Sequence, residues 1–206
     1  MNKKFFSILL AVVLTASYAQ AQITFGARAG LNLTNVWGDD TDDIKFKPGF
    51  QIGVVADYAL SNELSIQPGL LFAQQGFQFK EDNDYDKYTL NYLQIPINAQ
   101  YKLDLGGMKA FVQAGPYLGF GIGGKNKWKY DGEKDDDKIK FGNGNDDNFS
   151  PLDFGLGLGV GLQFSNIQVG VGYNLGLANI THKDYKDNFK VRNMGLALTV
   201  TCFFGN

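Results

Sequence analysis

The sequence predicts an all-β fold, an eight-stranded antiparallel up-and-down β-barrel that crosses a membrane. Three observations predict it. Apolar residues alternate with small or polar residues along many segments, short and long connections alternate between these segments, and charged residues gather in the long connections. A period of two indicates a strand with two different faces. In a transmembrane barrel the apolar face contacts lipid and the other face lines the interior.

The clearest alternation lies in residues 152–164. The even positions are all bulky and apolar: Leu152, Phe154, Leu156, Leu158, Val160, Leu162 and Phe164. The odd positions carry Asp153, Gln163 and four glycines. A continuous apolar face opposite a glycine face is unusual for a sheet in water, and it favours a strand between lipid and a narrow lumen.

Seven further segments show the same alternation. They are residues 23–34, 49–60, 64–73, 89–102, 110–123, 167–177 and 192–204. Each has about ten residues or more, which is the length that a strand tilted by about 45° needs to cross the hydrocarbon. The phase slips near residues 74–77, which predicts a β-bulge beyond the membrane.

The connections alternate in length. The short ones are residues 61–63, 103–109 and 165–166, and the long ones are residues 37–47, 80–88, 125–150 and 179–190. This alternation predicts periplasmic turns and four exposed extracellular loops. Aromatic residues on the apolar faces fall near both strand ends, as interfacial girdles do. They are Phe25, Tyr58, Tyr101, Phe164 and Phe204 near the short turns, and Phe50, Phe72, Phe120 and Phe154 near the long loops.

The N-terminus predicts export from the cytoplasm. Lys3 and Lys4 precede an apolar stretch at 5–14, and Ala19-Gln20-Ala21 is a small-x-small site. We therefore expect a signal peptide at residues 1–21, cleaved before Gln22, and one barrel domain at residues 22–206. Removal of residues 1–21 changes the formal net charge from −2 to −4. This mildly acidic charge gives no reason to expect that the protein binds nucleic acid. Cys202 is the only cysteine, so no internal disulfide can form.

A soluble barrel of the lipocalin type is the rival fold, because it also has eight strands. Its outer surface would then be the Gly, Gln, Asn and Thr face, whereas a solvent face is normally rich in Lys and Glu. Charged residues are almost absent from the predicted strands. The main exceptions are Arg28, Asp57 and Asp153, and all three lie on the small or polar face. The membrane barrel is therefore the favoured interpretation.

Polar residues on the inward faces predict a structural network in the lumen. Its predicted members are Arg28, Asp57, Gln67, Gln94, Gln113, Asp153 and Asn174. A charge in a narrow interior needs a partner, and Arg28 and Asp57 lie at similar depth on adjacent strands, so we expect them to pair. A proton or ion relay is the alternative role. Asp153 is expected near the outer mouth, within reach of water.

No residue pattern predicts catalysis, a cofactor or a specific metal site. The only histidine, His182, falls in the last long connection with no serine close in sequence, so we expect an exposed histidine and no enzyme. Acidic runs at 39–43, 82–86, 135–137 and 143–148 could bind Ca²⁺. However, Lys87 and Leu93 occupy the positions where a calcium loop needs Gly and Glu. Diffuse cation bridging to lipopolysaccharide is the favoured interpretation of these loops.

Several segments resemble a known family. They are FGARAGLN at 25–32, YLQIPINAQY at 92–101, FVQAGPYLGFGIGG at 111–124, DFGLGLGVGLQF at 153–164 and YNLGLANI at 173–180. They resemble the PorT-like outer-membrane β-barrel proteins of Bacteroidetes. The resemblance implies a Gram-negative outer membrane and an eight-stranded barrel. It implies no single activity, although PorT itself is associated with type IX secretion and gliding.

We therefore expect a non-enzymatic outer-membrane barrel with a structural or surface-interaction role through its four long loops. The alternative is an accessory role in type IX protein secretion. A small-solute channel is less favoured, because eight strands enclose little space, and so is a lipid-modifying barrel enzyme. The expected partners are outer-membrane lipids and lipopolysaccharide, the barrel assembly machinery during insertion, and secretion or surface proteins. No cofactor and no nucleic acid are expected.

Overall fold

The computed structural model describes residues 23–39, 41, 44–81, 84–142, 144–184, 186 and 189–204. The expected signal peptide and its cleavage site lie outside these residues. Within the described part the chain is all-β, with nine strands. No helix in that part is long and apolar enough to cross a membrane.

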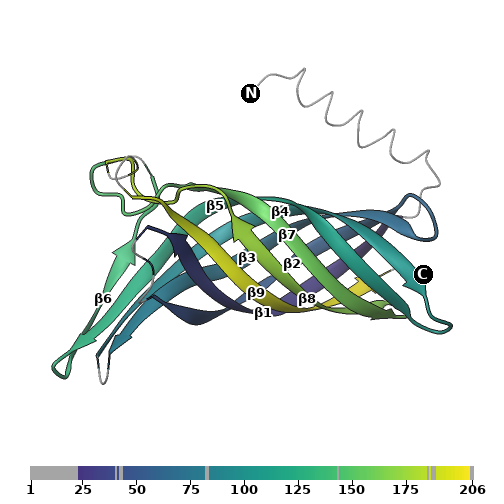
Figure 1. Cartoon of the computed structure of the whole chain (residues 1–206), viewed down its shortest axis with the longest axis horizontal. Coiled ribbons are helices and arrows are strands. Elements are labelled where there is room, and N and C mark those ends of the chain that lie inside the picture. Colours follow the sequence, from purple (N-terminus) through teal and green to yellow (C-terminus); the bar gives the residue numbers. More distant parts are fainter. Residues whose placement is uncertain are drawn as a thin grey trace, which may run out of the picture.

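The strands form one antiparallel up-and-down sheet that closes in a ring. They are β1 (Ile23–Gly38), β2 (Lys45–Ala59), β3 (Leu64–Glu81), β4 (Asp84–Asp104), β5 (Lys109–Tyr130), β6 (Glu133–Ile139), β7 (Leu152–Phe164), β8 (Ile167–Gly176) and β9 (Val191–Phe204). Strands β1 and β9 pair with each other, and β5 pairs with both β4 and β7, so the ring closes without β6 (Figure 1).

The ninth strand differs from the eight that the alternation predicts. Strand β6 lies inside the segment expected as a loop at 125–150, and it pairs only with the outer half of β5. Lys127 faces Asp136 across this pair. Residues 133–138 are all charged, so this strand carries no alternation of apolar and polar residues from which it could be predicted. The other eight strands correspond to the eight predicted segments, and β7 has the predicted bounds.

Two strands are far longer than a membrane requires. Strands β4 and β5 have 21 and 22 residues, whereas about 9–11 tilted residues cross the hydrocarbon. The surplus forms a sheet that we call the extension, made of residues 76–81, 84–89, 124–130 and β6. Figure 1 shows its hairpins reaching beyond the ring, at the end opposite to the arrowhead of β9. Most of the loop expected at 80–88 and half of the loop expected at 125–150 are therefore paired strand, held by aromatic contacts such as the Phe77–Tyr88 stack at 4.7 Å.

The β-bulge expected near residues 74–77 is present in the ladder between β2 and β3, although the extra residue lies on β2. Strand β3 keeps an unbroken register with β4 from Leu71 to Glu81. The register shifts in the pairing with β2 instead, between Phe46, which faces Phe77, and Gln51, which faces Ala73. Pro48, within this stretch of β2, has no N–H to donate to the ladder. The inward face of β3 changes from polar to apolar along the strand. Polar residues such as Gln67 are buried near the short turns, whereas Phe77 is buried near the long loops.

The outer face of the ring is apolar and the inner face is small or polar. Leu31 and Leu158 are 67% and 63% exposed, whereas Gln67 and Asp153 are buried. We call the exposed apolar surface the apolar belt; its members include Phe25, Leu31, Ile52, Val54, Ile97, Tyr101, Ile122, Val112, Leu158, Val171 and Leu198. A lipocalin-type barrel would bury this face, so the soluble alternative does not fit the structure.

Glycine on the inward face of the ring makes room for aromatic rings. A Cβ at Gly161 would lie 2.5 Å from the ring of Phe111, and one at Gly121 would lie 2.2 Å from the ring of Phe141. Neither distance is possible between real atoms, so Gly121 is required while the Phe141 side chain stays in place. At Gly161 a Cβ would also lie 2.3 Å from the carbonyl oxygen of Val169, so movement of the Phe111 side chain would not be enough.

Candidate functional site

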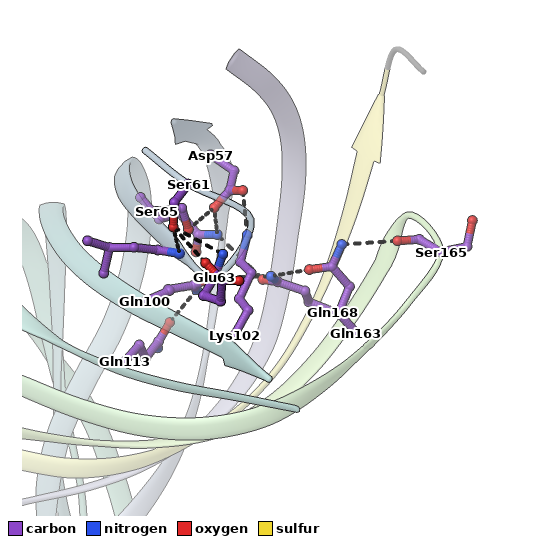
Figure 2. Close-up of polar contacts among 12 residues, drawn as sticks. Asp57, Ser61, Glu63, Ser65, Gln100, Lys102, Gln113, Gln163, Ser165 and Gln168 are labelled. Carbon is purple, nitrogen blue, oxygen red and sulfur yellow. Dashed lines mark hydrogen bonds and ion pairs between the residues drawn. The ribbon is translucent and has the colours of Figure 1, made fainter. Parts of the chain in front are cut away.

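A buried ion pair lies at the end of the ring where the short turns are, which we call the short-turn end. The Nζ atom of Lys102 lies 2.6 Å from Oδ2 of Asp57, and both side chains are about nine-tenths buried. Ser65 donates its hydroxyl to Oδ1 of the same carboxylate at 2.9 Å. Figure 2 shows these three side chains converging from β2, β3 and β4. The carboxylate of Asp57 is therefore satisfied by side chains from two other strands.

The predicted direct pair between Arg28 and Asp57 is wrong. Arg28 Nε donates to Oγ1 of Thr201 at 2.8 Å, and its guanidinium also donates to Oε1 of Gln67. Gln67 in turn donates to Oδ1 of Asp57 at 3.3 Å, so it bridges the two charged residues. The register between β1 and β2 explains the separation. Arg28 lies directly opposite Gly53 of β2, which is four residues from Asp57.

The sequence carries a signal for Lys102 that the prediction of the lumen residues missed. Every second residue from Gln94 to Gln100 faces the interior, and the same parity reaches Lys102.

Glutamines brace the ring from wall to wall at this end. Gln168 Nε2 donates to Oε1 of Gln100 at 3.2 Å and to Oε1 of Gln163 at 3.0 Å. Gln100 Nε2 donates to Oε1 of Gln113 at 2.8 Å, and Gln67 Nε2 reaches Oε1 of Gln168 at 3.4 Å. Figure 2 shows this chain of amides running across the interior. Together with Arg28 and Asp57, these residues form one network, which we call the polar network.

Asp153 belongs to a separate group near the other end of the ring. Its Oδ2 atom accepts hydrogen bonds from Asn193 Nδ2 at 2.9 Å and from the Tyr117 hydroxyl at 3.3 Å. Asn193 Nδ2 also donates to the Tyr92 hydroxyl at 3.2 Å. The expectation that water reaches Asp153 is wrong, because its exposure is 0%.

A small cavity lies between these two groups. Gln94 and Asn174 line it, together with Arg28, Tyr117 and Asn98, and its volume is about 50 Å³. This volume has room for about one or two water molecules, each occupying about 30 Å³ in the liquid. The seven predicted lumen residues therefore face the interior but do not form one network. Arg28, Asp57, Gln67 and Gln113 share the polar network, Asp153 lies apart, and Gln94 and Asn174 line the cavity.

The loop end of the ring is closed by apolar side chains. Its buried members are Val36, Phe77, Leu90, Tyr92, Ile139 and Ile180, with Phe141 and Phe149 packed against them. We call this cluster the apolar plug. Two connecting segments meet over it, since Ser150 N donates to the Ile180 carbonyl at 2.9 Å, and the first segment is itself held by the bond from Gly142 N to the Phe149 carbonyl at 3.0 Å. The interior is thus covered from both ends.

His182 is part of the contact between these two segments. The sequence predicted an exposed histidine, but its exposure is 5%. Its Nε2 atom lies 2.9 Å from the Gly144 carbonyl oxygen, and Nδ1 lies 3.4 Å from Oδ2 of Asp184. The expectation fails because the last connection folds back over the plug. The role that this geometry supports for His182 is to hold residues 144 and 182 together.

The acidic runs do not converge within the described residues. Asp136 of the run 135–137 lies on β6 and forms an ion pair with Lys125, which holds the pKa of the Asp136 carboxyl below its usual range. Among the residues whose positions are given, no three His, Cys, Asp or Glu side chains gather as a metal site would require. The runs 39–43, 82–86 and 143–148 each include residues outside the described part of the chain.

The family follows from a match over most of the chain. Residues 18–182 match the family described as "Outer membrane protein beta-barrel domain". The chain belongs to this family. Membership supports a location in the outer membrane, together with the exposed apolar belt. No curated protein matches the sequence.

Several solved outer-membrane proteins are similar in structure. Neisserial surface protein A has 16% sequence identity and a TM-score of 0.48, with 89% of this chain and 99% of that chain covered. Ail, the attachment invasion locus protein of Yersinia pestis, has 15% identity and a TM-score of 0.42, covering 88% and 98%. A major outer membrane protein from Thermus thermophilus has 16% identity and a TM-score of 0.41, covering 88% and 99%.

Proposed function

We propose that this protein is a non-enzymatic outer-membrane β-barrel with no open channel, whose extension acts at the cell surface. In this proposal the eight strands of the ring span the membrane and the extension lies outside the cell. One observation carries the proposal. The interior is filled by the polar network at one end and covered by the apolar plug at the other, while the extension is exposed. The chemistry available to partners is therefore on the outside.

The filled interior argues against a small-solute channel. The cavity at its centre measures only about 50 Å³ and is flanked by the guanidinium of Arg28 and the amides of Gln94 and Gln113. Opening a path would require breaking the hydrogen bonds that connect Gln67, Gln100 and Gln168. A buried polar network of this kind rigidifies the wall that it braces.

The arrangement of titratable groups supports a non-enzymatic role. Asp57 is neutralised by Lys102, and Asp153 is enclosed by Tyr117 and Asn193. His182 is buried against the backbone of Gly144. A general acid or base must reach the proton of its substrate, and these groups face other side chains instead.

Planar-bilayer recording of the full chain tests the closed barrel. Insertion is verified first by heat-modifiable migration on gels, so that a silent bilayer cannot result from unfolded protein. We expect no stable unitary conductance in neutral salt. A reproducible conductance from folded protein would overturn the closed interior. Incubation with outer-membrane lipid extracts, followed by mass spectrometry, tests the non-enzymatic role, and a new deacylated or cleaved lipid would overturn it.

A second proposal concerns protein secretion and rests on the sequence resemblance. The YLQIP segment at 92–96 and the AGPY segment at 114–117 resemble PorT-like proteins. Under this proposal the barrel is an accessory component of type IX secretion. Crosslinking in cells from a photoreactive residue placed at Tyr130, which is exposed on the extension, tests it. Repeated capture of secretion components supports the proposal, and their absence from efficient crosslinks contradicts it.

We also propose that residues 1–21 are removed during export, and that the barrel assembly machinery inserts the mature chain. The apolar segment at 5–14 and the Ala19-Gln20-Ala21 site support the first point. N-terminal sequencing of protein from the outer-membrane fraction tests it, with Gln22 as the expected first residue.

A further inference from the structure

The extension has two faces of opposite charge. Directly facing residues of antiparallel strands lie on the same face of a sheet. One row across the extension and the adjoining start of β2 reads Lys45, Gln78, Lys87, Lys127 and Asp136. The next row outward reads Lys80, Tyr85, Lys129 and Lys134, and the row nearer the ring includes Thr89, Lys125 and Lys138. We call this surface the lysine face.

The opposite face carries the acids. Phe79, Asp86, Trp128 and Asp135 form one of its rows, and Tyr88, Asn126 and Asp137 form another. Glu81, Asp84 and Glu133 lie on the same face near the hairpin tips. Among the paired residues that the structure describes, the lysine face holds eight lysines and one acid, Asp136, while the other face holds six acids and no lysine.

The lysine face continues the outer surface of the ring. Strand β4 alternates without interruption, so Leu93 and Ile97 of the apolar belt share a face with Lys87 and Thr89. The intervening positions of β4 point inward. They include Leu90 and Tyr92, which are fully buried in the apolar plug. On β5 the register with β4 shifts by one residue between Gly121 and Gly123. This shift changes the alternation, so that Lys125, three residues or about 10 Å beyond the exposed Ile122, lies on the outer face as well.

We propose that the lysine face binds the phosphate groups of outer-leaflet glycolipid molecules that surround the barrel. The inference rests on the proposed function, because it needs the belt in the membrane and the extension outside. Lipid tails that cover Ile122 would bring their headgroups to the height of Lys125 and Lys138. Ammonium groups bind phosphate as point charges, and their long apolar stems can lie along the belt.

Contacts within the lysine face leave several ammonium groups directed to the surroundings. Lys125 is paired with Asp136, and Lys87 lies over the ring of Tyr85, 4.3 Å from its centroid. The side chains of Lys127, Lys134 and Lys138 are exposed. Because they lie on neighbouring strands about 4.8 Å apart, they can contact more than one phosphate of the same lipid. A neutral headgroup offers no such charge complementarity.

Lipid retention measures the inference directly. The full chain is reconstituted in phosphatidylcholine bilayers that contain either bisphosphorylated lipid A or the same lipid without phosphates. Protein is then extracted in mild detergent, and the lipid that stays bound is counted by mass spectrometry. We expect preferential retention of the bisphosphorylated lipid by roughly tenfold, decreasing as salt is raised.

Two matched triple variants locate the binding surface. Lys127→Gln, Lys134→Gln and Lys138→Gln remove three charges from the lysine face. Lys140→Gln, Lys183→Gln and Lys190→Gln remove three exposed charges elsewhere at the loop end. We expect the first variant to lose the preference and the second to keep it. Equal loss in both variants, or no loss in the first, would overturn the proposal.

Further measurements distinguish lipid phosphate from soluble phosphate, and failure of the lipid inference from failure of the proposed closed barrel. Inorganic phosphate or the deacylated phosphorylated sugar, at the same concentration, should not displace the lipid; displacement by either would show a soluble anion site and overturn the proposal. Heat-modifiable migration and the absence of conductance are checked on the same samples. If these hold and retention fails, only the lipid inference is wrong. If they fail, the proposed closed barrel is wrong.

Discussion

Lys102 on β4 pairs with Asp57 on β2 across the interior, although β3 lies between these two strands in the sheet. The pair therefore spans the inner face of β3, and Ser65 of β3 donates its hydroxyl to the same carboxylate. These contacts connect three strands of the ring at the short-turn end.

Removing Lys102 should destabilise the folded ring. Lys102→Met leaves the Asp57 carboxylate buried without its cation, and we expect a loss of about 3 kcal/mol in the free energy of unfolding. Asp57→Ala should also lower the heat-resistant folded fraction on gels. Urea titration in detergent, followed by heat-modifiable migration, measures both effects. The double variant Asp57→Asn with Lys102→Met should recover part of the loss, and Lys140→Met, at an exposed lysine, should change little. Equal stability of Lys102→Met and the parent would contradict the importance of the pair.

Gly121 should not tolerate a side chain while Phe141 is in place. A Cβ at this position would meet the Phe141 ring at 2.2 Å, so Gly121→Ala should displace the ring and loosen the apolar plug, at a cost of about 1–3 kcal/mol. Limited proteolysis of the segment at 140–150 measures the loosening. Because Phe141→Ala removes the obstructing ring, Gly121→Ala should add little in that background. Gly119→Ala provides a comparison, as its Cβ would meet nothing closer than 3.4 Å and its φ is not positive. An additive effect of the two changes at the plug would argue against this packing.

Asp153 should matter as a hydrogen-bond acceptor more than as a charge. Asp153→Leu removes the acceptor of the Tyr117 hydroxyl and the Asn193 amide, and we expect a loss of about 1–3 kcal/mol. Asp153→Asn keeps one acceptor oxygen of similar shape and should cost clearly less. Chemical unfolding of both variants in the same detergent gives the comparison. If the two substitutions destabilise equally, the charge of Asp153, rather than its hydrogen bonds, is the important property.

The Lys125–Asp136 contact should be visible in the titration of Asp136. Hydrogen bonding to Lys125 lowers the pKa of this carboxyl from its ordinary value of 3.8. Lys125→Gln should raise it again, which carboxyl chemical shifts measured by NMR against pH will report. Because the folded pKa is the lower one, any stabilisation by the pair is present above pH 3.8 and disappears as the pH falls through the lowered value. Lys183→Gln, at a distant exposed lysine, should leave the pKa of Asp136 unchanged; a shift there would indicate a general charge effect.

The strands of the ring could be predicted from sequence because each one carries its own pattern. In residues 152–164 the alternation of leucine and glycine specifies both the strand and its lipid-facing side without reference to any other segment. The lumen residues followed from the same parity. Strand β6 could not be found in this way, because its residues from Glu133 to Lys138 are all charged and exposed, and only Ile139 at its end is buried.

Partner choice inside the ring depends on register, which the sequence pattern leaves open. Parity placed Arg28 and Asp57 on inward faces, but an offset of four residues separates them and brings Lys102 to Asp57 instead. Likewise, His182 and Phe141 fall in polar connections. Only the return of these connections over the end of the ring buries His182 and packs the half-buried Phe141 against the apolar plug.

The sequence alone determined which residues face outward and which face inward, because a period of two acts over neighbouring positions in one strand. The tertiary structure decided which inward residues meet, that both ends of the interior are covered, and that the lysines of β2 to β6 share one face. These properties depend on the stagger between strands and on the connecting segments that fold back over the end of the ring. They arise between segments distant in the chain, where no local pattern records them.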